Sequence, residues 1–356
     1  MTDQIQSRAP SASSQQFGEP AQRRSFDVVV SRGGLVESRH RVHVAVVSAD
    51  SQLLIAARDP HVTTWWRSCA KPFQVMPLLQ SGQFDALGWG VDELALACAS
   101  HGGEPEHVAL AERMLHRLGL DHTALACGPH EPLSTRGAEL LRATSLAPSR
   151  LHNNCSGKHA AMLARAVAEG WPTETYADHE HGVQRGAHTA VSAWSGMPTA
   201  HIARGVDGCG VTVFGQPISH MAFAYARLVA AAARGDDAPA RVVQAMTTRA
   251  ALVGGTDRFD TVLMDACGGA VVCKVGAEGV HTLGLVGRGI GIALKVEDGS
   301  ARAQYLAVLS VLEALDALPA APPTLLDELA CRSIRNTRGD VVGASRTSDA
   351  PLGAIA

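Results

Sequence analysis

The segment from residue 152 to 159, His-Asn-Asn-Cys-Ser-Gly-Lys-His, is the densest group of chemically reactive residue types in the chain. It supplies a thiol, a hydroxyl, an amine, imidazoles and amides, with almost no apolar side chain. An apolar run, residues 160–164, follows at once, so we expect a helix that opens within the segment and closes at Gly170. Cys155 and Lys158, three residues apart, then lie on one helical face.

A second thiol, Cys209, lies fifty residues further on, in the tight turn Asp207-Gly208-Cys209-Gly210. Two thiolates with a third donor, Lys158, suit a borderline metal such as zinc. A lysine ligand must lose its proton, which the cation itself favours. Two alternatives stay open: both cysteines are buried and unreactive, or Cys155 is a nucleophile with His159 as its base.

The run Arg67-Ser68-Cys69-Ala70-Lys71-Pro72 contains Ser-x-x-Lys at the expected start of a helix, where this spacing stacks the hydroxyl beside the amine. A lysine accepts the serine proton only when burial or a nearby cation makes it neutral. Arg67 and Lys274 are candidates for that cation. The alternative is that Ser68 caps the helix and Lys71 is solvated.

Ser100 and Lys274 are a second hydroxyl and a second amine. Ser100 precedes glycines whose amides can bind a developing oxyanion, while Lys274 alternates onto a buried or cleft-facing side with Val272. For Ser100, the alternative is a hydrogen bond to the backbone in a helix-entry loop. For Lys274, it is an ion pair with Glu278 or another acid.

The composition predicts a globular protein that acts on a small molecule. The 356 residues are 46% hydrophobic, which fits one large domain or two closely joined ones. Lys plus Arg total 31 against 34 for Asp plus Glu, and the longest basic block is Arg23-Arg24, so we expect neither a nucleic-acid nor a membrane partner. The eight cysteines lack framework spacing, which favours free thiols or metal ligands over disulfides.

Residues 1–25 are rich in Ser, Gln, Pro and Arg and lack the apolar core of a signal peptide. They predict a disordered tail and a cytoplasmic protein. The chain has no uninterrupted run of about 18 apolar residues, the length a membrane-spanning helix needs. We expect residues 26–356 to form a single catalytic domain.

The order of predicted elements is strands, helices, strands and a helix. β-Rich runs at 41–47 and 52–56 predict a hairpin, and three more at 270–275, 280–286 and 290–296 predict a meander. Helical patterns lie between them at 71–80, 105–118, 156–169, 218–234 and 238–247, and a last amphipathic helix runs from about 305 to 315. We therefore expect an α+β fold in which one antiparallel sheet, built from both ends of the chain, is covered by helices.

Several of these motifs, in this order, make the chain resemble the asparaginase II family. The Asn-Asn-Cys-Ser-Gly-Lys-His run is highly specific, whereas Ser-x-x-Lys alone would equally suggest a β-lactamase. The matching blocks are Val36–His40, Arg67–Gln74, Ala99–Pro105, Asn153–His159, Asp207–Gly210 and Lys274–Gly279. The resemblance implies a serine β-lactamase-like fold and a homodimer.

The resemblance also implies roles for individual residues. It implies two catalytic serine-lysine pairs, Ser68 with Lys71 and Ser100 with Lys274. It further implies a zinc ion held by Cys155, Lys158 and Cys209, and neighbours that help to position substrate or metal at Arg67, His159 and Asp207.

The expected function is therefore the hydrolysis of L-asparagine to L-aspartate and ammonia, through an acyl-enzyme on Ser68 that Lys71 activates, with zinc positioning the substrate. One alternative is a metal-independent serine amidohydrolase of the β-lactamase or glutaminase type. The other is a non-catalytic metalloprotein that binds an amino acid.

Overall fold

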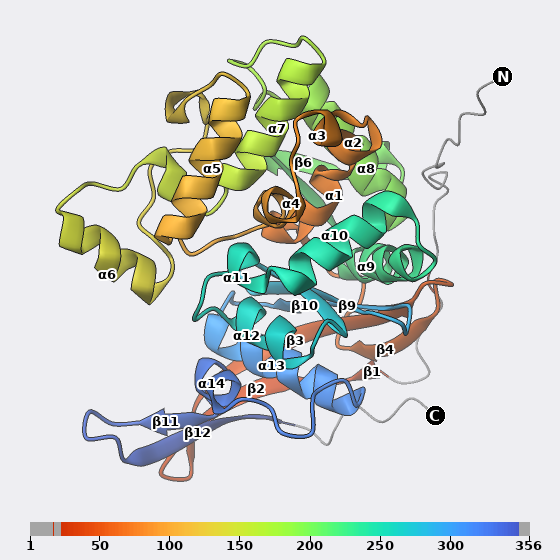
Figure 1. Cartoon of the computed structure of the whole chain (residues 1–356). Helices are drawn as coiled ribbons and strands as arrows, with labels where there is room; N and C mark the ends of the chain where they lie inside the picture. The colour runs from red at the N-terminus through yellow and green to blue at the C-terminus, as the bar shows by residue number, and fades with distance from the viewer. Residues whose placement is uncertain (1–16, 18–22, 349–356) are drawn as a thin grey trace.

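The computed structural model describes residue 17 and residues 23–348, and it has an α+β architecture (Figure 1). Its main sheet follows the order β11-β12-β2-β3-β10-β9-β8, with β4 paired to β3 and β1 paired to β4. Every pairing is antiparallel except that of β1 with β4. The strands are β1 Arg23–Arg24, β2 Asp27–Arg32, β3 Leu35–Ser48, β4 Leu53–Ala57, β8 Val271–Gly276, β9 Val280–Leu285, β10 Ile290–Val296, β11 Ser333–Arg335 and β12 Val341–Thr347.

Strand β3 shows how the helices cover this sheet. Its residues 42–47 are buried without interruption, whereas residues 35–37, next to the β2 turn, are exposed. Side chains alternate between the two faces of a strand, so continuous burial means that both faces are covered. Helices α9 (Ile218–Ala233) and α13 (Ala301–Ala314) provide this cover, and both contact β3 and β10.

Two glycines allow α9 to lie directly on the sheet. A Cβ atom at Gly291 of β10 would lie 1.9 Å from the main-chain oxygen of Ala222, and one at Gly284 of β9 would lie 2.5 Å from Val229. Any side chain at Gly291 would push the helix away from the strand. These contacts hold the helical region against the meander that carries Lys274.

The helical region, which lies between the N-terminal and C-terminal strands of the main sheet in the chain, carries a small second sheet of order β5-β7-β6. Within the described part of the chain, no helix is long and apolar enough to cross a membrane. The remaining elements are β5 Thr63–Trp65, β6 Ala203–Val206, β7 Thr212–Pro217, α1 Lys71–Gln74, α2 Met76–Gln80, α3 Gln83–Ala86, α4 Val91–Ala97, α5 Pro105–Arg117, α6 Thr135–Thr144, α7 Ser156–Ala168, α8 Gly182–Ser195, α10 Asp237–Thr248, α11 Ala250–Val253, α12 Phe259–Ala266 and α14 Thr324–Leu329.

The α+β class, the N-terminal hairpin, the meander and the long helices are confirmed. The helix expected at 71–80 is instead two short helices that meet at Val75, with Pro77 in the first turn of the second. Strands β2, β11 and β12, the small sheet and α8 were not predicted. Short edge strands and strands with mixed exposure lack a clear period, which is why sequence patterns miss them.

The structure describes only part of the predicted N-terminal tail. Phe17 packs edge-on against the rings of His220 and Phe223, and β1 pairs with β4. Residues 1–16 and 18–22 lie outside the described residues, so their predicted disorder stays a prediction.

Candidate active site

One cavity of about 500 Å³ brings most of the predicted site residues together. It lies between the end of β8, the 3₁₀ turn Arg67–Ala70, and the loops that precede α7 and α12. Six of the ten predicted site residues line it: Arg67, Ser68, Ser100, Cys155, Asp207 and Cys209. The other four are buried outside its lining: Lys71, Lys158, His159 and Lys274.

Lys71 contacts Ser100, the serine of the other predicted pair. Its Nζ donates to Ser100 Oγ at 3.0 Å, to the main-chain oxygen of Asn154 at 3.3 Å, and to that of Ala99. Only 1% of Lys71 is exposed, so the solvated alternative is excluded. Three acceptors around one Nζ fix the lysine in place.

Ser68 lies half-buried on the cavity wall. The N-cap of α1 is Ala70, so Ser68 does not cap that helix. Within residues 23–348, its hydroxyl has no hydrogen-bond partner. The preceding residue, Arg67, has a positive φ of 48°, a strained value for a residue with a side chain and one that clusters at functional sites.

Lys274 is fully buried and faces Asp260, a residue not singled out from the sequence. Its Nζ lies 3.8 Å from Asp260 Oδ2 and donates to the main-chain oxygen of Val275 at 3.0 Å. Asp260 Oδ2 accepts the N–H of Val275 at 2.8 Å, and Oδ1 lies 3.1 Å from His281 Nε2. The acid that pairs with Lys274 is therefore Asp260, and Glu278 lies on the cavity wall instead.

Burial and the neighbouring charges shift the pKa values of Lys274 and Asp260. Burial lowers the pKa of Lys274 to about 8, and the charge of Asp260 opposes that shift. Burial also opposes the charge of Asp260, but His281 and Lys274 hold the pKa of this carboxyl well below its usual range. The pair is an ammonium and a carboxylate that stabilise each other in a dry environment.

Asp260, Cys273 and His281 also have the donor types of a metal site, with donor atoms within 4.8 Å of one another. The Lys274 ammonium already neutralises Asp260 there, and a second cation would meet its repulsion. The thiol of Cys273 lies 3.7 Å from the main-chain oxygen of Asp260. These contacts favour a buried charge network over a metal centre.

Cys155, Lys158 and Cys209 form a contiguous donor set. Lys158 Nζ lies 2.9 Å from Cys209 Sγ, and the Cys155 thiol donates a hydrogen bond to Cys209. That bond and the Lys158 charge lower the pKa of Cys209 to about 4, while the pKa of Cys155 is raised to about 12 by the same bond and by burial. Burial opposes the charge of Lys158, but the two sulfurs and Asp207 raise its pKa. Two sulfurs and one amine in contact fit a zinc ion.

The close approach of helix α7 to α4 at Gly157 explains why this motif needs a glycine. A Cβ atom there would lie 2.4 Å from the main-chain oxygen of Leu96 in α4. Helix α7 therefore crosses α4 at a distance that no side chain permits. The first turn of α7, which carries Cys155 and Lys158, is held in place by this crossing.

The three predicted neighbours differ in position. Arg67 Nε donates to Asp207 Oδ1 at 2.8 Å, and both residues line the cavity. His159 is fully buried, and its Nδ1 lies 2.6 Å from the hydroxyl of Tyr176. Burial and the Lys158 charge lower the pKa of His159 to about 3, so it is neutral. His159 thus contacts Tyr176 and does not line the cavity.

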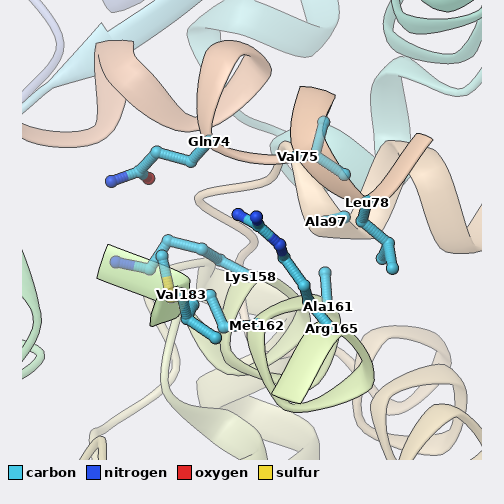
Figure 2. A pocket seen from close by; sticks show the side chains of 9 residues that line it. All are labelled: Gln74, Val75, Leu78, Ala97, Lys158, Ala161, Met162, Arg165 and Val183. Carbon is cyan, nitrogen blue, oxygen red and sulfur yellow. The ribbon is translucent and has the colours of Figure 1, made fainter. Parts of the chain in front are cut away.

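A much smaller cavity lies on the other side of Lys158 (Figure 2). Its volume is about 10 Å³, and Figure 2 shows Lys158 and Arg165 of α7 facing Gln74 and Val75 across it. This space holds about one water molecule and no substrate. The cavity of about 500 Å³ is the candidate active site because six of the predicted site residues line it.

The lysines give a further indication of a site, which only the structure provides because it depends on their burial. The chain has four lysines, Lys71, Lys158, Lys274 and Lys295, and the first three are at most 4% exposed. Lysine is almost never fully buried unless it is paired, so three buried lysines in one region mark a functional site. Asp260 and Arg258 lie outside every motif that the sequence analysis used.

A wall with two serine hydroxyls and buried lysines beside it is typical of serine hydrolases. The family model described as L-asparaginase II matches residues 28–347 of this chain. The chain therefore belongs to the asparaginase II family, and it is an L-asparaginase, an amidohydrolase. A search of curated proteins found no match to the chain.

Proposed function

We propose that this enzyme hydrolyses the side-chain amide of L-asparagine to L-aspartate and ammonia through an acyl-enzyme on Ser68. One observation carries the proposal: Ser68 and Ser100 line the same cavity, and the buried Lys71 is hydrogen-bonded to Ser100 beside it. Lys71 of the first predicted pair is thus hydrogen-bonded to Ser100, the serine of the second predicted pair.

In the proposed reaction, Ser68 Oγ attacks the amide carbon and its proton passes to a neutral Lys71, directly or through the Ser100 hydroxyl. The C–N bond then breaks, and the leaving ammonia takes a proton from Lys71 or Lys274. Water next attacks the ester, which releases L-aspartate and restores Ser68. No residue is oxidised or reduced.

The end of β8 offers a donor for the oxyanion. β8 is an edge strand, and the N–H of Val275 points out of the sheet to Asp260. Ala277 is the first residue of the turn 277–279 that follows β8, and we propose its N–H as the donor. Ala277 lines the cavity together with Ser68. Removing one oxyanion donor costs about a hundredfold in rate or more.

We propose that Cys155, Lys158 and Cys209 hold zinc. The ion would supply positive charge that orients the substrate, since two thiolates blunt its acidity towards bound water. Their contacts with one another and the thiolate character of Cys209 support this ligand set. The protein residues alone carry the proton transfers above.

The test is ammonia release from L-asparagine by the wild type, Ser68→Ala and Ser100→Ala at equal concentration, with mass spectrometry of the enzyme quenched during turnover. We expect an adduct on the peptide that contains Ser68 and a silent Ser68→Ala variant. The hydrogen bond of Lys71 favours a second candidate, in which Ser100 attacks. An adduct on the Ser100 peptide would establish that candidate and exclude ours.

The metal-independent alternative makes separate predictions. A β-lactamase-like or glutaminase-like enzyme would hydrolyse nitrocefin or L-glutamine readily and keep its activity after treatment with a chelator. We expect neither. Family membership disfavours the third alternative, a non-catalytic binding protein, because the family is enzymatic.

We also propose a single catalytic domain over residues 26–356 and a cytoplasmic location, and the family resemblance supports a serine β-lactamase-like fold and a homodimer. The antiparallel sheet built from both chain ends, with helices between, supports the proposed fold. Light scattering tests the dimer, with an expected mass of twice the 37.2 kDa chain. A mass of one chain at micromolar concentration would exclude it.

A further inference from the structure

Two arginines line the active-site cavity, and they differ in their partners. Arg67 forms an ion pair with Asp207 at 2.8 Å. Arg258 forms no ion pair with any residue of the described chain, and its Nη1 donates at 3.2 Å to the main-chain oxygen of Leu133, another residue of the wall. Arg258 is therefore the guanidinium on the wall whose charge no protein carboxylate neutralises.

The three buried lysines beside the cavity already contact groups of the protein. Lys158 contacts the Cys209 sulfur, Lys274 faces Asp260, and Lys71 has three oxygen acceptors. None of these lysines lines the cavity. Among the side chains that line the cavity, Arg258 thus offers an entering anionic group a positive charge that no protein carboxylate neutralises.

The backbone around Arg258 is held in place. The buried carboxylate of Glu104 accepts hydrogen bonds from the N–H and the hydroxyl of Thr256, at 2.9 and 3.0 Å. Glu104 is itself bound to Arg136 at 2.8 Å. Arg258 then caps the N-terminus of α12 in an extended conformation. A guanidinium on an anchored backbone is pre-organised, which reduces the entropy lost when it binds a ligand.

We infer that Arg258 binds the α-carboxylate of the substrate and so determines specificity for an amino acid over a simple amide. The inference rests on the proposed function, because L-asparagine carries that carboxylate next to the amide that reacts. A guanidinium offers two parallel N–H groups that match a carboxylate, and such charge-assisted pairs are stronger than neutral hydrogen bonds. Arg258 positions the substrate and takes no part in bond breaking.

The test compares wild type, Arg258→Gln and Arg258→Lys as purified full-length proteins. Calorimetry measures L-aspartate, the product that keeps the carboxylate, and steady-state kinetics measures L-asparagine. We expect Arg258→Gln to weaken L-aspartate binding about 30-fold or more and to raise KM for L-asparagine similarly, with kcat changed less than about tenfold. Arg258→Lys keeps the charge without the fork and should fall between the two.

Two controls separate this role from a general loss of charge or of fold. Arg302→Gln removes the same charge from an exposed position on α13 and should leave both affinities unchanged. Inhibition by 3-aminopropanamide, which lacks the carboxylate, should be equal in wild type and Arg258→Gln. If Arg258→Gln does not fold, Arg258→Lys carries the comparison.

An L-aspartate affinity within threefold of wild type in Arg258→Gln would overturn the inference, as would an equal loss in Arg302→Gln. The proposed function fails by a different result, the absence of ammonia release by the wild type. In that case the binding of L-aspartate to wild type and variant still tests Arg258.

Discussion

Lys71 Nζ and Ser100 Oγ lie 3.0 Å apart, although 28 residues separate them in the chain. The bond joins the start of α1 to the loop before α5, and it links the lysine of one predicted serine-lysine pair to the serine of the other. Lys71 is buried, and its three hydrogen-bond acceptors all belong to the protein, so its removal leaves the Ser100 hydroxyl without this partner.

Replacing Lys71 by Met should abolish catalysis while keeping the side-chain volume. We expect kcat for L-asparagine to fall about a thousandfold or more, because a positioned proton acceptor contributes about 10² to 10⁴. Ammonia release measures the effect, and Lys295→Met is the control, since Lys295 lies outside the cavity lining. An activity within tenfold of wild type would exclude Lys71 as the base.

Asp260→Asn should destabilise the protein because it leaves Lys274 buried without its carboxylate. We expect the free energy of unfolding at pH 7 to drop by about 3 kcal/mol in urea titrations. The pKa of Asp260 is depressed, so its contribution is present above the unfolded pKa and is lost as pH falls through the folded one.

Two further variants make this measurement specific. Asp260→Asn combined with Lys274→Met should regain at least half of the loss, because it removes the unpaired charge as well. Asp265→Asn, at an exposed position of the same helix, should change stability by less than about 0.5 kcal/mol. No recovery in the double variant would contradict the ion pair.

The pH profile should report Lys274, whose pKa is about 8 through burial. We expect kcat/KM to fall above about pH 8, as Lys274 loses the proton that it returns to ammonia. Asp260→Asn should move this limb to lower pH, since the Asp260 carboxylate raises the pKa of Lys274. The other neighbours act equally in both proteins: Lys71 and Arg258 lower the pKa of Lys274, and Cys69 raises it. An unmoved limb would assign the titration to another group.

The free energy of unfolding should also report the titration of Lys274, but it should rise with pH where kcat/KM falls. Between about pH 8 and 10.5 the unfolded chain binds more protons at Lys274 than the folded one. The free energy of unfolding contributed by this lysine therefore rises with pH through that window and is constant below it. Urea titrations of wild type and Lys274→Met across the window isolate the contribution.

Cys155→Ala should remove the metal and weaken substrate affinity. We expect zinc content, measured by mass spectrometry of the dialysed protein, to fall from about one ion per chain to below one-tenth. KM for L-asparagine should rise with it. Cys267→Ala is the matched control, since that thiol lies far from the cavity lining and faces Ala317. Unchanged zinc content in Cys155→Ala would refute the ligand set.

Gly157→Ala should disrupt the site through the backbone alone. Its methyl group would meet the main-chain oxygen of Leu96, so α7 must move away from α4. We expect a loss of about 2 kcal/mol in stability and weaker zinc binding. Gly128→Ala is the control, because a Cβ there meets nothing within 4 Å. Equal effects of the two substitutions would show that the close crossing is unimportant.

The motifs with local spacing were predictable. The reactive residues of Ser-x-x-Lys, and those of the Asn-Asn-Cys-Ser-Gly-Lys-His run, are only a few residues apart within each motif, so their chemistry is visible without a fold. The backbone changes from a 3₁₀ turn into α1 between Ser68 and Lys71, and the hydrogen bond of Lys71 to Ser100 was not predicted. A three-residue interval sets a helical face only where the helix is regular.

The sequence by itself determined the class of the fold, the N-terminal hairpin, the meander and several of the long helices, and which hydroxyls, amines and thiols can do chemistry, because these depend on local pattern and residue type. The tertiary structure alone decided the pairing of Lys274 with Asp260 and the free guanidinium of Arg258. Both depend on the packing of α12 against β8, which brings together residues with no periodic relation in the chain. Burial then opposes the charge of Lys274, and the Asp260 carboxylate that the fold places beside it favours that charge.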